Sequence, residues 1–259
     1  MRGGLTWAAL CGAIVLATST CAAAEPAAYK VLTLGGFPVR WMPGKHATEL
    51  VLRYRIADQA VEQPGAINCK RMRPPASLLG ASGITVEAFR HALSAAFQRW
   101  RDVADIVFVE AGAGQRADIV IGEQAEPQGY AFTNLDLATE TEGGVRAIVG
   151  ASICLNPKRH WKIGYDGNVD VYDLVHTFAH EIGHVIGLDH PSGRGHLMSF
   201  RYSELHDGLS QGDRMGAIAL YGPSRLRSQT AALPDPTGDG GSARITTTLG
   251  RSIDGASAN

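Results

Sequence analysis

Residues 180–190 read HEIGHVIGLDH and hold the residue types that metal-assisted hydrolysis needs. His180 and His184 are four positions apart, so on a helix they share one face with their Cβ atoms about 5–6 Å apart. Two imidazoles at that spacing can take one zinc ion. Glu181 follows the first histidine and can reach a water bound to the metal. The segment therefore predicts a zinc site with a carboxylate beside it.

Gly187 and His190 extend this pattern. Glycine tolerates positive φ, so Gly187 can end the helix and reverse the chain, which brings in His190 as a third ligand. Three protein ligands plus one water are typical of catalytic zinc, whereas structural zinc sites are closed by four protein ligands. Histidines at helical spacing can also lie at a surface or satisfy a core hydrogen bond. The full HExxHxxGxxH spacing favours the catalytic zinc site over those readings.

The segment resembles the metzincin metallopeptidases, in which this motif is followed by a methionine in a tight turn beneath the metal. Met198 follows His190 at the short spacing of the matrixin branch, the family of matrix metalloproteinases. Tyr202 matches a matrixin tyrosine that helps wall the S1′ pocket, and residues 209–222 resemble the last matrixin helix. The resemblance covers roughly residues 40–222. It implies a zinc-dependent endopeptidase acting on protein or peptide substrates, with Glu181 as general base.

Three differences from the family pattern limit the metal content. Phe200 stands where astacins and many serralysins carry a tyrosine that can ligate zinc. Matrixins usually have proline there. The histidines of the matrixin structural zinc have no counterpart near residues 147–156. We therefore expect one catalytic zinc, and the resemblance leaves calcium open.

The resemblance also assigns the cleft walls. It implies that the strand at 147–154 is the upper edge of the cleft, where it pairs antiparallel with an extended substrate, and that residues 203–209 shape the S1′ pocket. His176, one turn before His180, is expected on the helix face or in support of the site. Asp189 is expected at the surface or beside His190 as a supporting group.

Hydrophobic periodicity and capping residues predict the surrounding elements. Residues 58–83 are rich in Pro, Gly and small residues and are expected to form a long loop. The fold class is α+β (α/β-like); the resemblance implies a metzincin-type domain with one twisted, mostly parallel sheet, an active-site helix and a C-terminal helix. The predicted strands are 50–56, 105–110, 117–122 and 147–155, and the predicted helices run from Thr85 to Trp100, from Asp170 to Ile186 and from Ser210 to Tyr221.

The ends of the chain are expected to lie outside this domain. Arg2, the uncharged run 5–18 and Ala22–Ala24 are typical of a signal peptide over residues 1–24. The run is shorter than the roughly 20 residues of a membrane span, and an uncleaved anchor or a lipid on Cys21 are the alternatives. Residues 25–222 are expected to form the peptidase domain and 223–259 a disordered tail. The protein is accordingly expected to be secreted or periplasmic.

Cleavage of such a signal leaves two cysteines, Cys69 and Cys154. In an oxidising compartment two cysteines favour one disulfide, and two buried free thiols are the alternative. Cys69 could also be read as a cysteine switch that masks the zinc, but Asn68-Cys69-Lys70-Arg71 lacks that motif.

Composition and charge exclude several partner classes. The 259 residues are 45% hydrophobic, enough for a globular core, with a net charge of −1. Near-neutral charge gives no electrostatic reason to expect nucleic acid or a stable membrane partner, and we expect a monomer. Two other functions stay open: a non-catalytic zinc-containing peptide-binding module, and a zinc hydrolase of cell-wall peptides. Glu181 argues against the binding module, because zinc binding alone does not need that carboxylate.

Overall fold

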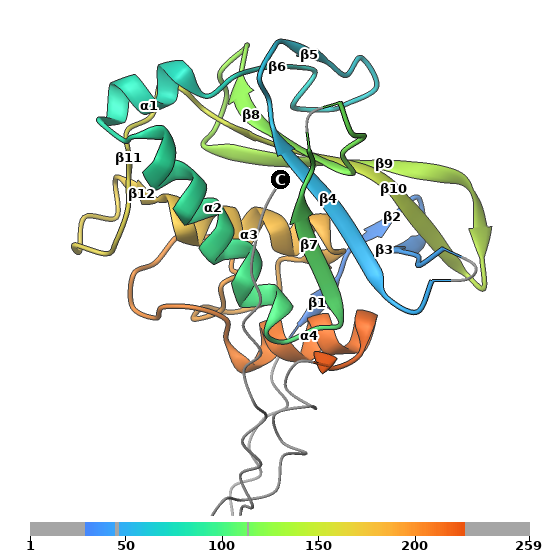
Figure 1. The fold of residues 1–259 in the computed structure, drawn as a ribbon. Helices are drawn as coiled ribbons and strands as arrows, with labels where there is room; N and C mark the ends of the chain where they lie inside the picture. The colour runs from blue at the N-terminus through green and yellow to red at the C-terminus, as the bar shows by residue number, and fades with distance from the viewer. Residues whose placement is uncertain (1–28, 45–46, 113, 226–259) are drawn as a thin grey trace, which may run out of the picture.

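The structure, a computed structural model, describes residues 29–44, 47–112 and 114–225 (Figure 1). The expected signal peptide and nearly all of the expected tail lie outside these residues. Among the described residues no helix is both long and apolar enough to span a bilayer. The helices are α1 (Ala76–Ser82), α2 (Val86–Arg101), α3 (Leu174–Val185) and α4 (Gln211–Tyr221). The strands are β1 (Lys30–Val31), β2 (Thr33–Leu34), β3 (Phe37–Trp41), β4 (Leu50–Ile56), β5 (Val61–Glu62), β6 (Arg71–Arg73), β7 (Ile106–Glu110), β8 (Ile119–Gln124), β9 (Ala131–Glu142), β10 (Val145–Leu155), β11 (Trp161–Lys162), β12 (Tyr172–Asp173) and β13 (Leu188–Asp189).

One mixed sheet organises the domain. Its centre is parallel: β10 pairs with β3 and β8, and β4 pairs with β8 and β7. β9 runs antiparallel along the whole of β10 and pairs with no other strand in the described part of the chain. The expected α+β fold with a mostly parallel central sheet is confirmed. The expectation that the 147–154 strand is the edge beside the cleft is wrong, because β10 has partners on both sides and β9 is the edge strand.

Helices α2 and α3 pack on each other beside the sheet (Figure 1). Thr85 caps α2 as predicted, since its side chain accepts from the backbone N–H of Ala88. Phe178 of α3 is fully buried and meets Phe89 of α2 edge to face, with ring centroids 5.2 Å apart. Burying an aromatic side chain of this kind contributes about 1.5–3 kcal/mol. The apolar stripes of the two helices therefore fix α3 against the core and leave its other face to the site.

The start of α3 differs from the prediction. Asp173, three residues after the expected cap Asp170, accepts the N–H of His176 at 2.6 Å and is the N-cap. Tyr172 and Asp173 first pair with Trp161 and Lys162 as β12 on β11, so the chain is still extended there. Strand pairing delays the helix by three positions, an effect that capping preferences cannot show.

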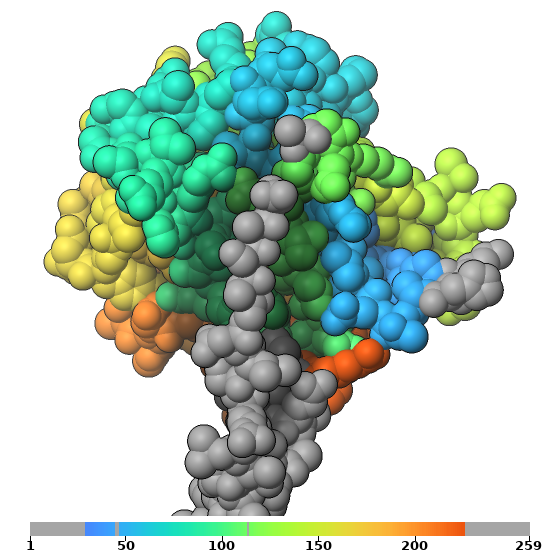
Figure 2. Space-filling view, in the orientation of Figure 1, coloured from blue at the N-terminus to red at the C-terminus, as the bar shows by residue number. Residues whose placement is uncertain are grey.

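The segment 58–83 is more ordered than the expected loop. It holds β5, β6 and α1, and β6 joins the main sheet by pairing with β8. The segment lies at the top of the molecule in the view of Figures 1 and 2, where it forms part of the surface. Strands of two or three residues carry too little periodicity to be predicted from sequence.

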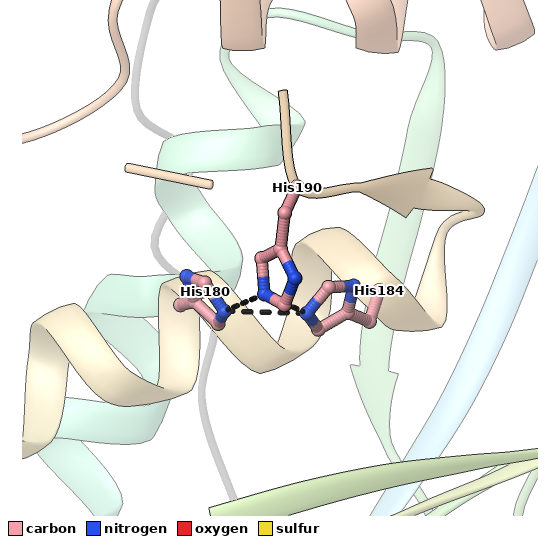
Figure 3. Close-up of side chains that lie close together, drawn as sticks. All are labelled: His180, His184 and His190. Atoms are coloured by element: carbon pink, nitrogen blue, oxygen red, sulfur yellow. Dashed lines mark hydrogen bonds between the residues drawn. The ribbon is translucent and has the colours of Figure 1, made fainter. Parts of the chain in front are cut away.

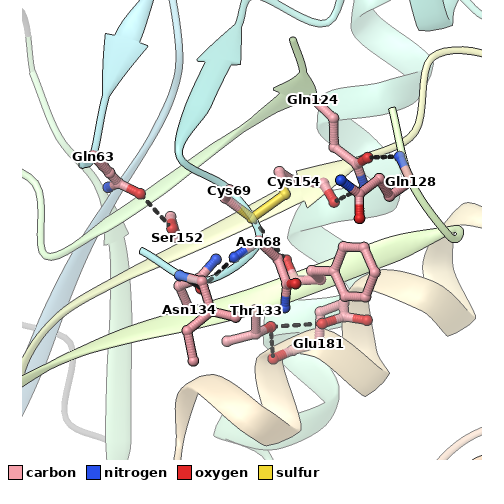
Figure 4. Close-up of a disulfide and its surroundings, with 12 residues drawn as sticks. Gln63, Asn68, Cys69, Gln124, Gln128, Thr133, Asn134, Ser152, Cys154 and Glu181 are labelled. Atoms are coloured by element: carbon pink, nitrogen blue, oxygen red, sulfur yellow. Dashed lines mark hydrogen bonds between the residues drawn. A yellow bond between two sulfur atoms is a disulfide. The ribbon is translucent and has the colours of Figure 1, made fainter. Parts of the chain in front are cut away.

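A disulfide fastens this segment to the sheet. Cys69 and Cys154 are bonded, with Cα atoms 5.8 Å apart, and both side chains are fully buried (Figure 4). The predicted disulfide is present, and Cys69 has no free thiolate with which to mask a metal. Met72 belongs to the same small buried cluster, so the covalent link and a local core act together.

Replacing both cysteines by serine tests the contribution of this bond. The bond closes a sequence separation of 85 residues, and in the chain-entropy model such a loop contributes about 4–5 kcal/mol. Urea unfolding of Cys69→Ser/Cys154→Ser should show a loss of up to that size relative to wild type. Thiol labelling of the unreduced exported wild type should find both cysteines blocked. Two reactive thiols in folded protein would contradict the bond.

Candidate active site

The three predicted histidines meet at one point (Figure 3). His180 and His184 project from one face of α3, and His190 follows β13 after the chain has reversed. Gly187 makes the reversal with φ of +92°, and a Cβ there would lie 2.4 Å from the carbonyl oxygen of Val39. Only glycine fits that position without displacing the sheet, so the glycine of the motif is a packing requirement as well as a turn.

The spacing of the nitrogens fits a zinc ion. The Nε2 atom of His180 lies 3.1 Å from Nε2 of His190, and Nε2 of His184 lies 3.2 Å from each of the other two. A tetrahedral zinc with Zn–N distances of about 2.0–2.1 Å needs its nitrogens roughly 3.3 Å apart. Among the described residues this is the one group of three His, Cys, Asp or Glu side chains close enough to hold an ion.

The other ring nitrogens define the tautomers. Nδ1 of His180 faces the carbonyl of Leu197 at 2.8 Å, and Nδ1 of His184 faces that of Leu188 at 2.8 Å. A carbonyl can only accept, so both Nδ1 atoms carry the proton and both Nε2 atoms present lone pairs. Burial also lowers the pKa of His184 to about 3, which keeps that ring neutral. Lone pairs at these distances repel one another unless a cation lies between them.

Glu181 is buried beside the histidines and lines the same cavity. Burial raises the pKa of its carboxyl group, and the nearby His180 and Thr133 oppose that shift. The hydroxyl of Thr133 on β9 donates to Oε2 of Glu181 at 2.6 Å (Figure 4). Thr133 thereby holds the carboxylate in place from the opposite wall of the cleft, a role that the sequence did not indicate.

Met198, the methionine that the resemblance places in a turn beneath the metal, packs against α3 at Gly183. Its side chain is 1% exposed, and a Cβ added to Gly183 would clash with its sulfur at 2.1 Å. Asp213 of α4 accepts the backbone N–H groups of Leu197 and Met198 at 2.8 and 3.2 Å and also that of Ser210. The same carboxylate therefore fixes the turn that carries Met198 and caps the last helix. Sequence reasoning missed Asp213 as a residue of the site.

A cavity of about 810 Å³ opens over the histidines. Tyr202 lines it and stacks on Tyr172, with ring centroids 4.4 Å apart, and Tyr172 stacks in turn on Tyr130 at 3.9 Å. Residues 203–209, expected to shape the pocket, are not in its lining. Glu204 instead supports the wall from behind, since it accepts the hydroxyl of Tyr202 at 2.6 Å.

His176, Asp189 and Phe200 also surround the site. Nδ1 of His176 lies 2.7 Å from the hydroxyl of Tyr165, and burial lowers the pKa of His176 to about 3. Asp189 accepts the backbone N–H of His190 at 2.8 Å and pairs with Lys30. Phe200 is 81% exposed and meets the His190 ring edge to face at 5.3 Å. All three line the cavity, and none of them belongs to the group of described side chains that lie close enough together to hold a metal ion.

Comparison with known proteins agrees with this geometry. The matrixin family model matches residues 80–222, more than half of the chain. Interstitial collagenase of Oryctolagus cuniculus is 30% identical over 151 residues, which cover 56% of this chain and 31% of the relative. Human stromelysin-3 is 32% identical over 167 residues, which cover 59% and 31%. Serralysin of Photorhabdus laumondii is 33% identical over 108 residues, which cover 41% and 21%.

The fold and the matching relatives define a zinc metalloendopeptidase domain of the metzincin type. Within that class the chain belongs to the matrixin family. It spans about a third of the length of the collagenase and stromelysin relatives. Family membership implies zinc, and the three histidines are positioned to bind it.

Replacing His184 tests the metal site. Purified His184→Ala should retain little zinc, because two remaining histidines do not complete a catalytic zinc site. His91→Ala is the matched control: His91 is an exposed histidine of α2 and should leave zinc at about one ion per chain. Elemental analysis of the two variants and the wild type is the measurement. Full zinc occupancy in His184→Ala would refute the ligand assignment.

Proposed function

We propose that this protein is an extracytoplasmic zinc endopeptidase in which His180, His184 and His190 hold one zinc ion and Glu181 is the general base. The observation that carries the proposal is the convergence of three Nε2 atoms within 3.2 Å, with a buried carboxylate in the same cavity. When bound, zinc supplies a Lewis acid that polarises a carbonyl and lowers the pKa of a coordinated water.

Side chains and backbone groups of the protein supply the other catalytic and binding functions. The carboxylate of Glu181 accepts a proton from the attacking water and later delivers it to the nitrogen of the leaving amine. Thr133 holds that carboxylate toward the cleft during both transfers. The free edge of β9 offers backbone N–H and C=O groups with which an extended peptide can pair. Tyr202 forms a wall of the S1′ pocket, and Met198 supports the histidines from below.

Two further features favour an extracytoplasmic, oxidising compartment. The Cys69–Cys154 bond belongs to compartments that sustain disulfides, and the relatives include collagenase and stromelysin-3. We assign residues 1–24 to a signal peptide. We extend the peptidase domain, expected to span 25–222 before a tail at 223–259, to residue 225, because the backbone N–H of Ser224 donates to the carbonyl of Val103 at 2.9 Å. The remainder of the expected tail lies outside the described residues. The proposed substrates are proteins or peptides, and the proposed state is a monomer.

Digestion of a peptide library tests the proposed activity. The wild type should cleave internal peptide bonds, and a zinc chelator should abolish the cleavage. Cell-wall fragments, tested in parallel, would be cleaved in preference to peptides if the chain were a cell-wall hydrolase. Stoichiometric zinc with no cleavage of either substrate would favour a binding module.

Glu181→Gln tests the general base. Glutamine keeps the shape of glutamate but cannot take up a proton, so zinc and fold should remain while hydrolysis falls by about 10²–10⁴-fold. The kcat of the variant and its zinc content should be measured together. A variant that retains zinc and wild-type kcat would show that another group is the base.

Thr133→Val tests the residue that holds the base. Valine has nearly the same shape but no hydroxyl, so the carboxylate loses the one side-chain hydrogen bond that the described residues give it. We expect kcat to fall roughly tenfold, which corresponds to about 1.4 kcal/mol, with KM and zinc content near those of the wild type. Thr133→Ser, which keeps the hydroxyl, should recover most of the rate. Equal kcat for the valine and serine variants would exclude this role.

A further inference from the structure

A segment outside the family match borders the cleft. The matrixin match begins at residue 80, so the disulfide-bonded segment after β4 precedes it. Four consecutive residues of that segment, Gly65–Asn68, line the cavity over the histidines. We refer to Gly65–Asn68 as the lip. Because it lies before the matched region, the match to the family does not account for its contribution to the cleft.

The backbone of the lip is fixed on two sides. Oδ1 of Asn134 on β9 accepts the N–H of Ile67 at 2.9 Å and that of Asn68 at 3.1 Å. The next residue, Cys69, is bonded to Cys154 of β10 (Figure 4). Gln63, two residues before the lip, accepts the hydroxyl of Ser152 on β10 at 2.8 Å. The lip is therefore attached both to β9, which lines the cavity, and to β10 behind it in the sheet.

Ile67 is held with most of its side chain in solvent. It is 83% exposed although its own backbone N–H is bonded to β9. An apolar partner that covers this side chain would be stabilised, because apolar surface is removed from water. Single exposed apolar side chains are common and need no explanation by themselves. Ile67 differs from such residues because its backbone is fixed and because it lines the cavity that contains Glu181.

The position of the lip indicates which part of a substrate it would meet. Successive side chains of a strand point to opposite faces of its sheet. Thr133 points toward α3 and Glu181, so Phe132 and Asn134 point to the other face. Phe132 packs on the Cys69–Cys154 cluster there, and Asn134 bonds the lip. A peptide paired with β9 would likewise alternate its side chains between α3 and the lip.

We propose that Ile67 is a specificity-determining residue that contacts an apolar side chain of the peptide substrate. That side chain occupies the position next to the one that points toward α3. This inference rests on the proposed endopeptidase function. The substrate would then be recognised at two places, the pocket walled by Tyr202 and the disulfide-bonded lip.

Positional profiling of a peptide library with charge-bearing variants tests the inference. The wild type should favour apolar residues at one substrate position beside the scissile bond. Ile67→Asp should lower kcat/KM for those peptides by about tenfold or more and select Lys or Arg at that same position. Ile67→Lys should select Asp or Glu there. A variant that merely disrupted the lip would lose the apolar preference, but it would not gain a preference for substrate residues of the opposite charge.

Val86→Asp is the matched control. Val86 is 60% exposed at the start of α2 and outside the cavity lining, so the variant introduces the same charge elsewhere and should keep the wild-type profile. Zinc content and Tm should match the wild type in all variants. If the wild type cleaves peptides and both Ile67 variants keep its positional profile, the inference about the lip is wrong while the proposed function stands. Absence of cleavage by zinc-loaded wild type would overturn the proposed function and this inference with it.

Discussion

Three imidazole lone pairs directed at one point are the constraint on which the site depends. Nitrogens 3.1–3.2 Å apart repel one another without a cation, so the fold must hold the rings in place by other contacts. The carbonyls of Leu197 and Leu188 do this for His180 and His184, because each accepts the Nδ1 proton and leaves Nε2 free. Partners of this kind orient metal ligands and set their tautomers.

Those two carbonyls are themselves positioned by distant parts of the chain. Asp213 of α4 holds the backbone at Leu197, and the pairing of β1 with β13 holds Leu188. Helix α4 and the first described strand therefore both bear on ligand geometry. Met198 fills the space under Gly183, so α3 cannot move toward the core without a clash. The positions of the three histidines therefore depend on α3, α4, the β1–β13 pair and the turn that carries Met198.

The wall of the cleft that faces α3 consists of β9 and the lip, and it is held by other contacts than the metal site. Its edge strand β9 supplies Thr133 to the base on one face and Asn134 to the lip on the other. The lip comes from a segment that precedes the family match, and Cys69 bonds it to β10. The metal site thus lies within the residues that match the family model, while one rim of the cleft comes from residues before that match.

The sequence by itself determined the ligand spacing, the glycine reversal and the caps at Thr85 and Ser210, because each depends on residues within one or two turns of helix. It placed the α3 cap at Asp170, since only the pairing of β12 with β11 selects Asp173. It did not indicate β9, whose residues are partly buried or exposed throughout and show no regular alternation. One face of that strand meets the base and the other bonds the lip. Contacts between residues distant in sequence leave no local period, so only the tertiary structure could decide which strand is the edge and what faces the cleft.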